Sequence, residues 1–302
     1  MNRRELLKRS AALGWTAVGS LTIPAATAAA LDAAQQNSPL NLLTPPANAP
    51  IPVAFLISEG AVVIDFCGPW EVFERVYLPD RKHDAFSLYT VAETAAAITA
   101  SGGLKITPNY TIANAPAPKV IVIPAQSPAS EATKNWIRNA TKSTDVTMSV
   151  CTGAFVLAST GLISGMSATT HHGAYVDLAM QFPDIHVQRG ARFVESGNLA
   201  TAGGLTSGID LAFRVVERYF GRDVASQTAT LLEYQGQGWL NPNSNSEFAG
   251  PIKQTPNHPV CAVCGMEIDR SLSSNYKGKT YYFCVREHKQ IFDASPEQFA
   301  AK

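Results

Sequence analysis

Short apolar runs that alternate with helical patterns between residues 51 and 237 constrain the fold more than any other feature of the sequence. The apolar runs lie at 53–58, 86–92, 120–124, 146–150 and 168–171. The helical patterns lie at 70–76, 130–140, 153–160 and 174–182. Buried apolar strands that alternate with helices form parallel sheets covered on both faces. The sequence therefore predicts an α/β fold, with a parallel sheet sandwiched by helices.

The predicted domain ends with a hairpin and two amphipathic helices. The hairpin pairs residues 193–195 with 199–202, and the helices lie at 207–220 and 224–234. These elements set the domain at 51–237. Stretches rich in Pro, Asn, Gly and Ser flank it and predict linkers at 35–50 and 238–258.

Composition excludes several classes of protein. Of the 302 residues, 46% are apolar and 16% are charged, which is incompatible with a disordered or fibrous chain. Lys and Arg number 24, as do Asp and Glu; without residues 1–34 there are 24 − 4 = 20 basic and 24 − 2 = 22 acidic residues. The basic excess of a nucleic-acid-binding protein is absent, so we expect no nucleic-acid partner.

Residues 1–34 predict an export signal. A basic start with adjacent Arg3 and Arg4 precedes a mildly apolar stretch at 11–23 and small residues at 25–30, where a signal peptidase would cut. The paired arginines resemble the twin-arginine signal, which exports folded proteins. We therefore expect a periplasmic protein without stable membrane insertion after cleavage. The alternative is a membrane anchor, for which the stretch is too polar.

Cys151 lies where an apolar strand changes to a helical pattern within about two residues. A cysteine at such a turn resembles a nucleophile elbow, with its sulfur exposed above the sheet edge. Gly153 would allow close backbone approach, and the N–H groups of the helix start would lower the thiol pKa from about 8.5. The alternative is a small buried residue that only fills space.

Four segments, at 60–73, 151–154, 168–171 and 202–211, resemble the ThiJ/PfpI superfamily, which has a flavodoxin-like, class I glutamine amidotransferase-like fold. The chain looks most like the branch that contains isonitrile hydratases and the N-terminal domains of AraC-type regulators. In those regulators a helix-turn-helix region follows, whereas here a cysteine-rich segment does. The regulator interpretation is therefore disfavoured.

The resemblance implies the site residues. Asp65 takes the place of an acid that hydrogen-bonds the nucleophilic Cys151, as a protonated acid or by sharing a proton with the sulfur. Its alternative role is a helix cap. His171 matches a histidine near the cysteine and would act as base or acid, or serve only structure. Thr152 would offer its backbone N–H to a developing oxyanion.

Two further features qualify this site. Relatives commonly have Pro-Gly-Gly after the third strand, whereas this chain has Pro124-Ala125-Gln126, which changes the oxyanion pocket. Cys67, two residues beyond Asp65, is either a redox partner of Cys151 or a packing residue.

Residues 259–302 hold three of the five cysteines, in the spacing C-x2-C-x19-C-x3-H. Cys261, Cys264, Cys284 and His288 supply the four donors of a tetrahedral S₃N metal site. A unit of about 44 residues rarely folds on apolar burial alone, so a metal is expected to stabilise it. The alternative is a disulfide between two of the cysteines.

This segment resembles the YHS domain, from the paired cysteines through residues 281–284 to Pro296-Glu297. His288 stands where many members have a fourth cysteine. One metal ion is expected: Zn(II) fits best by geometry, while Cu and Fe stay open because thiolates bind them too.

The sequence thus predicts an exported ThiJ/PfpI protein that carries a YHS-like metal-binding domain. Cys151 would attack a small electrophilic carbon and water would follow, as in isonitrile hydration. One rival is a non-enzymatic metal-handling or redox-stress protein; another is a small-ligand-binding domain that has lost its chemistry. The expected partners are a small molecule and a metal ion, and the family implies a possible homodimer.

Overall fold

Seven strands form the central sheet, in the order β10-β11-β7-β6-β1-β2-β5. Their bounds are β1 Ile51–Leu56, β2 Phe86–Ala92, β5 Tyr110–Thr111, β6 Val120–Ile123, β7 Val146–Val150, β10 Phe193–Ser196 and β11 Leu199–Ala202. All neighbours are parallel except β10 and β11, which form the expected hairpin. The predicted parallel α/β fold is confirmed.

The computed structural model describes residues 41–250, 259–265 and 268–300. The export signal expected at residues 1–34 lies outside them. Within the described part of the chain, no helix is both long and apolar enough to span a membrane.

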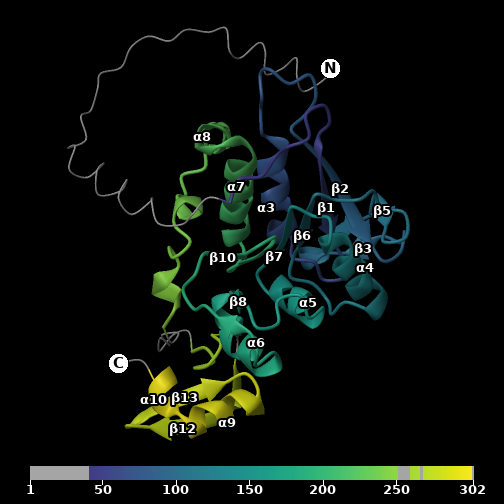
Figure 1. Ribbon diagram of the computed structural model, residues 1–302. Helices are drawn as coiled ribbons and strands as arrows, with labels where there is room; N and C mark the ends of the chain where they lie inside the picture. The colour runs from purple at the N-terminus through teal and green to yellow at the C-terminus, as the bar shows by residue number, and fades with distance from the viewer. Residues whose placement is uncertain (1–40, 251–258, 266–267, 301–302) are drawn as a thin grey trace, which may run out of the picture. The chain divides into compact units, whose positions relative to one another are not determined.

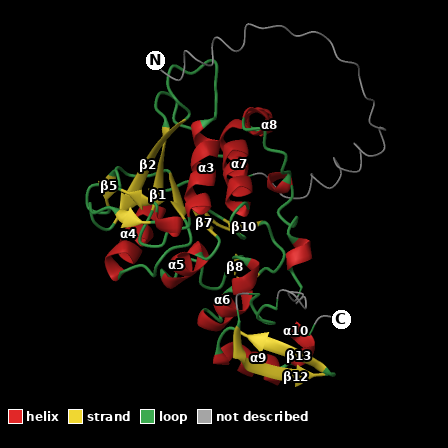
Figure 2. Cartoon of the chain, turned by 180° about the vertical axis from the view of Figure 1, so that it is seen from behind, coloured by secondary structure: helices red, strands yellow, loops and turns green. Residues whose placement is uncertain are grey.

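Helices cover both faces of the sheet (Figures 1 and 2). α3 (Val63–Glu74) and α7 (Ser207–Phe220) lie side by side on one face, and α8 (Arg222–Leu231) packs against α7. α4 (Glu131–Thr141) and α5 (Gly153–Ser159) lie on the other face.

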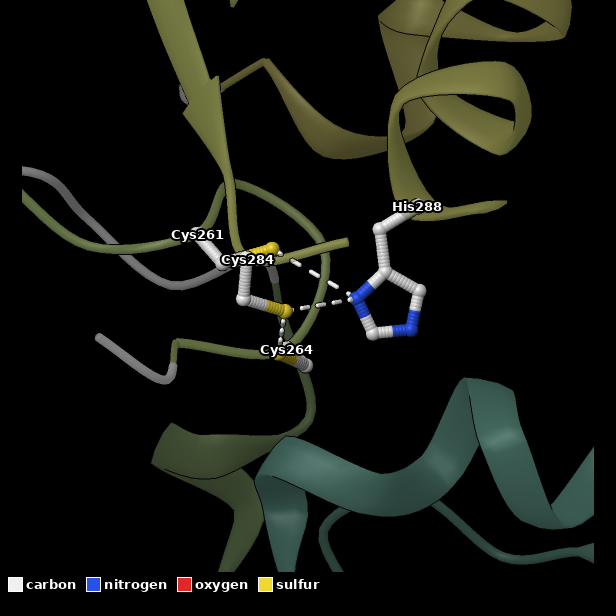
Figure 3. A group of neighbouring side chains, drawn as sticks. All are labelled: Cys261, Cys264, Cys284 and His288. Carbon is white, nitrogen blue, oxygen red and sulfur yellow. Dashed lines mark hydrogen bonds between the residues drawn. The ribbon is translucent and has the colours of Figure 1, made fainter. Parts of the chain in front are cut away.

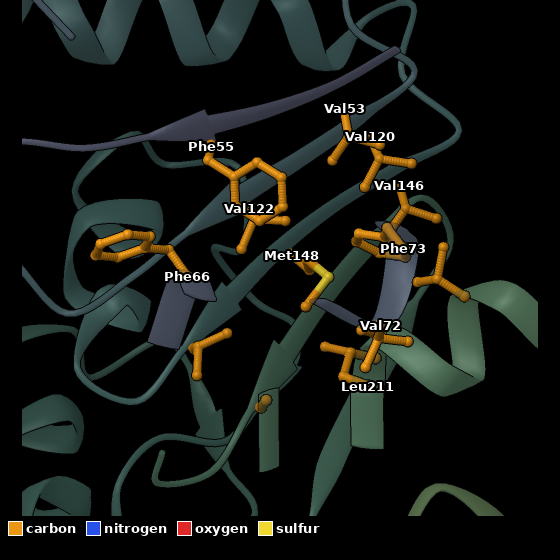
Figure 4. Packing of buried hydrophobic residues seen from close by; sticks show 14 of the residues in the cluster. Val53, Phe55, Phe66, Val72, Phe73, Val120, Val122, Val146, Met148 and Leu211 are labelled. Atoms are coloured by element: carbon orange, nitrogen blue, oxygen red, sulfur yellow. The ribbon is translucent and has the colours of Figure 1, made fainter. Parts of the chain in front are cut away.

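The strand alternation divides the core into two clusters. Val53, Phe55, Val122 and Met148 point toward α3 and α7, where they meet Phe73 and the other residues of Figure 4. The residues between them along the strands, such as Ala54 and Ile121, pack on the α4 and α5 side. Because β6 is buried at all four positions, its sequence reads as a continuous apolar run rather than an alternating one.

Two elements differ from the sequence prediction. The helix expected at 70–76 begins at Val63, because Pro69 lies inside α3 instead of marking its start. The strand expected at 168–171 is only β8 (Ser167–Ala168), which pairs with β9 (His186–Val187) outside the main sheet. The residues after β8 make hydrogen bonds that involve side chains instead of the backbone pairing of a strand. The Thr170 hydroxyl, for example, donates to the Cys151 carbonyl over 2.9 Å.

Two short segments connect the main elements. β3 (Ile98–Thr99) and β4 (Lys105–Ile106) pair with each other around η1 (Ser101–Gly103), and η2 (His172–Ala174) leads into α6 (Tyr175–Gln181).

The C-terminal part has its own elements. β12 (Asp269–Tyr276) and β13 (Lys279–Phe283) form an antiparallel hairpin, followed by α9 (Arg286–Ala294) and α10 (Pro296–Phe299). Phe283, Phe292 and Phe299 form the core of this C-terminal part.

The segment expected as a linker at 238–258 is described as far as residue 250. There it contains η3 (Gly238–Leu240) and η4 (Ser246–Phe248) and packs on the preceding domain. The Trp239 side chain is buried, and the backbone N–H of Trp239 donates to the buried Asp210 carboxylate over 2.9 Å. Arg192 pairs with the same carboxylate and also donates to Asn245, which ties this segment to β10 and α7.

Candidate active site and metal centre

The strand order places the candidate site. From β1 the chain adds β2 on one side of the sheet, whereas from β6 it adds β7 on the other, so the strand order reverses between β1 and β6. Open α/β sheets bind ligands in the crevice outside the carboxyl ends of the strands at such a point. The loops after β1, β6, β7 and β11 all emerge at this edge. The loops after β6, β7 and β11 carry Ala125, Cys151 and Leu205, and the loop after β1 leads into α3, which carries Asp65 in its first turn.

Cys151 forms the sharp turn between β7 and α5. Its φ of +57° is a left-handed conformation that non-glycine residues rarely adopt. Two bonds fix it: its N–H donates to the Gly203 carbonyl over 2.9 Å, and its carbonyl accepts from the Thr170 hydroxyl. The expectation of an exposed sulfur is wrong, because the residue is only 8% exposed and contributes to the core.

Gly153 makes the elbow possible. A Cβ at this position would lie 2.2 Å from the Ile123 carbonyl oxygen and 2.7 Å from that of Pro124. We expect Gly153→Ala to lower the free energy of unfolding by about 3 kcal/mol, because backbone atoms at the end of β6 would have to move. Urea unfolding of this variant measures the loss. Gly250→Ala is the control, since a Cβ there meets no atom of the described residues within 4 Å. Equal stability of the two variants would contradict the close approach.

Asp65 is fully buried in the first turn of α3. Its Oδ2 accepts the Ala125 N–H over 3.1 Å, while Oδ1 is buried with no partner among the described residues. The helix cap considered as its alternative role is wrong: Val62 occupies the N-cap position, and no side chain caps the helix. Burial raises the pKa of Asp65 to about 6, against the opposing effect of the Ala125 bond.

The Cys151 thiol is neutral at pH 7. Burial, and then the Asp65 carboxylate, raise its pKa to about 11. Hydrogen bonds to the sulfur from Thr152 and from the Leu205 backbone act in the opposite direction without outweighing them. The expected lowering of the thiol pKa by the helix start is therefore wrong, because desolvation of the thiolate is the larger effect.

His171 lies beside the Gly203–Leu205 segment. A Cβ on Gly204 would lie 2.5 Å from its Cδ2, and its Nδ1 accepts the Gly173 N–H over 3.1 Å. Burial and the neighbouring His172 lower the pKa of His171, so the ring is neutral with its proton on Nε2. Since Nδ1 already accepts a hydrogen bond, the ring has only its Nε2–H to offer. Of the roles considered, an acid or a structural residue therefore fits His171 better than a base.

The Pro124-Ala125-Gln126 loop has a defined role here. Its Ala125 N–H is taken up by Asp65, and the Gln126 side chain donates to the Leu56 carbonyl over 3.1 Å. The backbone donor at Ala125 therefore holds the carboxylate. Cys67 is half-buried and packs against the core around α3, as its packing interpretation expects.

Cys261, Cys264, Cys284 and His288 lie together, with their ligand atoms all within 4.8 Å of one another. Figure 3 shows His288 Nδ1 facing the sulfurs, 3.2 Å from Cys284 and 3.6 Å from Cys261. The Cys264 and Cys284 sulfurs are 3.4 Å apart, too far for a disulfide bond of about 2.05 Å. None of the five cysteines, all of which lie in the described residues, forms a disulfide bond.

These four residues fit a metal ion. A tetrahedral zinc with bonds of about 2.0–2.3 Å places its ligands roughly 3.5–3.8 Å apart, close to the observed separations. Hydrogen bonds from Cys264 and His288 hold the pKa of Cys261 well below its usual range. The bond to Asp177, followed by that to Cys261, raises the pKa of His288 to about 11. Without the ion, Cys261 thus carries a thiolate beside a protonated His288. A metal ion would keep the thiolate and displace the proton on His288 Nδ1, because metal-bound histidine is neutral at the coordinating nitrogen.

Comparison with known proteins agrees with this fold. The model of the DJ-1/PfpI family matches residues 52–218, more than half of the chain. The chain belongs to the DJ-1/PfpI family. The YHS domain model matches residues 262–302, which cover the Cys/His cluster. The two resemblances seen in the sequence are confirmed, and the cluster together with the YHS match supports metal binding.

Proteins similar to this chain are named for different activities. An isonitrile hydratase from Pseudomonas putida is 34% identical over 187 residues, which cover 60% of this chain and 78% of that protein. The HTH-type transcriptional regulator GbdR from Pseudomonas aeruginosa is 21% identical over 196 residues, 63% of this chain and about half (53%) of the regulator.

Solved structures show the same DJ-1/PfpI fold. A ThiJ/PfpI protein from Pseudomonas syringae has a TM-score of 0.56 and 22% identity, covering 73% of this chain and 83% of that chain. Drosophila melanogaster DJ-1beta has a TM-score of 0.53 and 18% identity, covering 62% of this chain and all of its own. At these identities the likeness concerns the fold alone.

Sequence reasoning missed three groups of this DJ-1/PfpI domain. The N–H groups of Ala125 and Leu205 carry no side-chain signal, although Leu205 lies in the segment at 202–211 that resembles the family. Leu205 also adopts a positive φ of +42°. Asp177 contacts His288 across 111 residues of sequence, a contact that no local pattern reveals.

Proposed function

We propose that this protein is a cysteine-dependent hydratase of small isonitriles. The observation that carries the proposal is the buried pair of Cys151 and Asp65, in which a neutral thiol lies beside a carboxylate with an unpartnered oxygen. An unpaired buried oxygen is costly, and a functional proton acceptor accounts for it. The similarity to an isonitrile hydratase supports the substrate class.

In the first step the Cys151 sulfur bonds to the terminal isonitrile carbon while Asp65 takes the thiol proton and passes it to the same carbon. The product is a thioimidate, S–CH=N–R, which contains all atoms of thiol and isonitrile. The N–H groups of Thr152 and Leu205 that reach the sulfur stabilise it as it loses its proton. Asp65, with a pKa of about 6, is ionised at neutral pH and close to the optimum for a general base.

In the second step water adds to the thioimidate carbon, and one of its protons goes to nitrogen. The remaining hydroxyl proton passes through Asp65 to the sulfur as the carbon–sulfur bond breaks. This releases an N-substituted formamide and restores the thiol. His171, neutral with its proton on Nε2, is suited to donate a hydrogen bond to the substrate nitrogen.

The metal ion belongs to the C-terminal part. Cys261, Cys264, Cys284 and His288 would hold it, and Zn(II) fits the three thiolates and one imidazole best. With all four positions filled by protein ligands, the ion would supply folding stability. Elemental analysis of the purified protein distinguishes zinc from copper and iron.

The redox-stress alternative is less well supported. Oxidation of a cysteine follows its thiolate character and exposure, and Cys151 is both buried and neutral. The ligand-binding alternative leaves the unpartnered Asp65 oxygen without a purpose.

The test is incubation of the reduced, zinc-loaded protein with a small alkyl isonitrile, with the formamide followed by proton NMR. The proposal predicts formamide well above the rate in buffer and one water consumed per isonitrile. Unchanged isonitrile, at a protein concentration equal to the substrate, would refute the hydratase.

Asp65→Asn should lower the hydratase activity and raise the free energy of unfolding. With the folded pKa raised from 3.8 to about 6, the ionised carboxylate costs the fold about 3 kcal/mol above pH 6, and this cost vanishes as pH falls below about 4. The free energy of unfolding of the variant, measured in urea, should therefore exceed that of the wild type by about 3 kcal/mol at pH 8. At pH 4 the two proteins should be about equally stable. It should also lose the rise in activity through pH 6. Exposed Asp80→Asn is the control, and equal stabilities at pH 8 would contradict this role.

We also propose that residues 1–34 export the protein to a periplasm, from the adjacent Arg3 and Arg4 and the small residues that follow the apolar stretch. Cell fractionation tests this. The double change Arg3→Lys, Arg4→Lys should keep the protein in the cytoplasm with its signal uncleaved, and periplasmic protein from this variant would contradict the twin-arginine route.

A further inference from the structure

The segment that follows His171 lies against the metal-binding cluster. Three contacts show this, each from a different residue of η2 and α6. A Cβ on Gly173 would lie 2.4 Å from the Cys264 carbonyl oxygen. Val176 packs against the core of the C-terminal part. Asp177 Oδ1 lies 2.8 Å from His288 Nε2.

The Asp177 contact has the geometry of a metal site's supporting carboxylate. Metal-bound histidines usually donate their second ring N–H to a carboxylate, which fixes the ring and raises its basicity. Here His288 Nδ1 faces the sulfurs (Figure 3), so its Nε2 is the nitrogen left for such a bond. The His288 side chain is 6% exposed, whereas that of Asp177 is 36% exposed at the rim.

From these contacts we infer that Asp177 is a positioning residue of the metal site, supplied by the DJ-1/PfpI domain to the YHS domain. The metal ion then binds most tightly when the C-terminal part is docked on η2 and α6. By linkage, metal binding strengthens that docking to the same extent. This inference rests on the proposed metal site at the four ligands.

The segment at 171–177 also contacts residues that lie next to Cys151. Gly173, which contacts Cys264, donates its N–H to His171, whose ring packs on Gly204 beside Leu205. The metal site and the Cys151 elbow are thus joined through contiguous packed residues. The backbone of Gly173 approaches the Cys264 carbonyl so closely that a Cβ would not fit between them. A C-terminal domain connected only by a flexible linker would not require a glycine at this position.

The test uses zinc alone, in competition with a chromophoric chelator, on the reduced full-length protein. Asp177→Ala should weaken zinc binding about 10–100-fold. Asp177→Asn keeps an acceptor for the Nε2 proton and should lose less. Asp184→Ala, an exposed aspartate seven residues further on, is the matched control and should bind within about twofold of the wild type.

A second measurement reports the docking. Hydrogen exchange of α6 amides should slow when zinc binds the wild type, and slow much less in Asp177→Ala. Equal zinc affinity and equal α6 protection in Asp177→Ala and Asp184→Ala would overturn the role of Asp177. A wild type that binds no zinc would instead refute the metal site itself, a result seen before any variant is made. Thermal unfolding of each variant checks that the DJ-1/PfpI domain is intact.

Discussion

Removing the metal ion should unfold residues 259–302 and leave the cooperative unfolding of the DJ-1/PfpI domain in place. The core of the C-terminal part consists of a few aromatic and small residues around the cluster, such as Phe283 and Phe292. So small a core cannot offset the conformational entropy of the segment. Binding free energy of the ion then becomes folding free energy, on the order of 10 kcal/mol for a structural zinc.

Hydrogen exchange with and without a strong chelator measures this effect. Amides of β12, β13 and α9 should lose protection in chelator, whereas those of β1, β6 and β7 should keep it. Cys261→Ser should reproduce the loss without chelator, and Cys67→Ser, outside the cluster, should not. Full protection of the hairpin in chelator and reductant would contradict a metal-stabilised domain.

Cys151→Ser should abolish isonitrile hydration, with a loss of at least about 10³-fold, equivalent to about 4 kcal/mol. A serine hydroxyl is far less acidic than a thiol, so Asp65 with its pKa of about 6 cannot take the proton as the bond to carbon forms. The stability should change little, because the two side chains differ by one atom. Initial rates of formamide formation measure the loss.

Cys67→Ser is the matched control, since Cys67 lies on α3 near the site but packs against the core. It should keep full activity. A Cys151→Ser variant that hydrates isonitriles at the wild-type rate would place the reaction elsewhere in the protein.

The sequence predicted the framework well because local patterns determine it. The strand at 86–92, the strand at 146–150 and the helix at 207–220 occur with the predicted bounds. β7 is buried at all five positions and α7 at twelve of its fourteen, so tertiary packing supports the predicted pattern over the full length of each of these two elements. The helix start at Val63 was missed because Pro69, normally a first-turn residue, lies inside this helix.

The chemistry of the site was less predictable from sequence. The elbow and the nearness of Asp65 to Cys151 follow from local pattern and resemblance, but the thiol pKa depends on how much water the folded chain excludes. Burial of both side chains by segments from β1, β6, β7 and β11 reverses the effect expected from the helix start. The Asp177–His288 contact depends on how two domains pack, which neither domain's motif encodes.

The most direct test of the account is the mass of the Cys151 peptide during turnover. Wild-type protein mixed with an isonitrile is quenched in acid within milliseconds, digested and mapped by mass spectrometry. The account predicts that the peptide holding Cys151 is heavier by the mass of one isonitrile, because the addition loses no atoms, and that the Cys67 peptide is unchanged. Formamide formation without any adduct on Cys151 at any quench time would contradict the nucleophilic role of this cysteine.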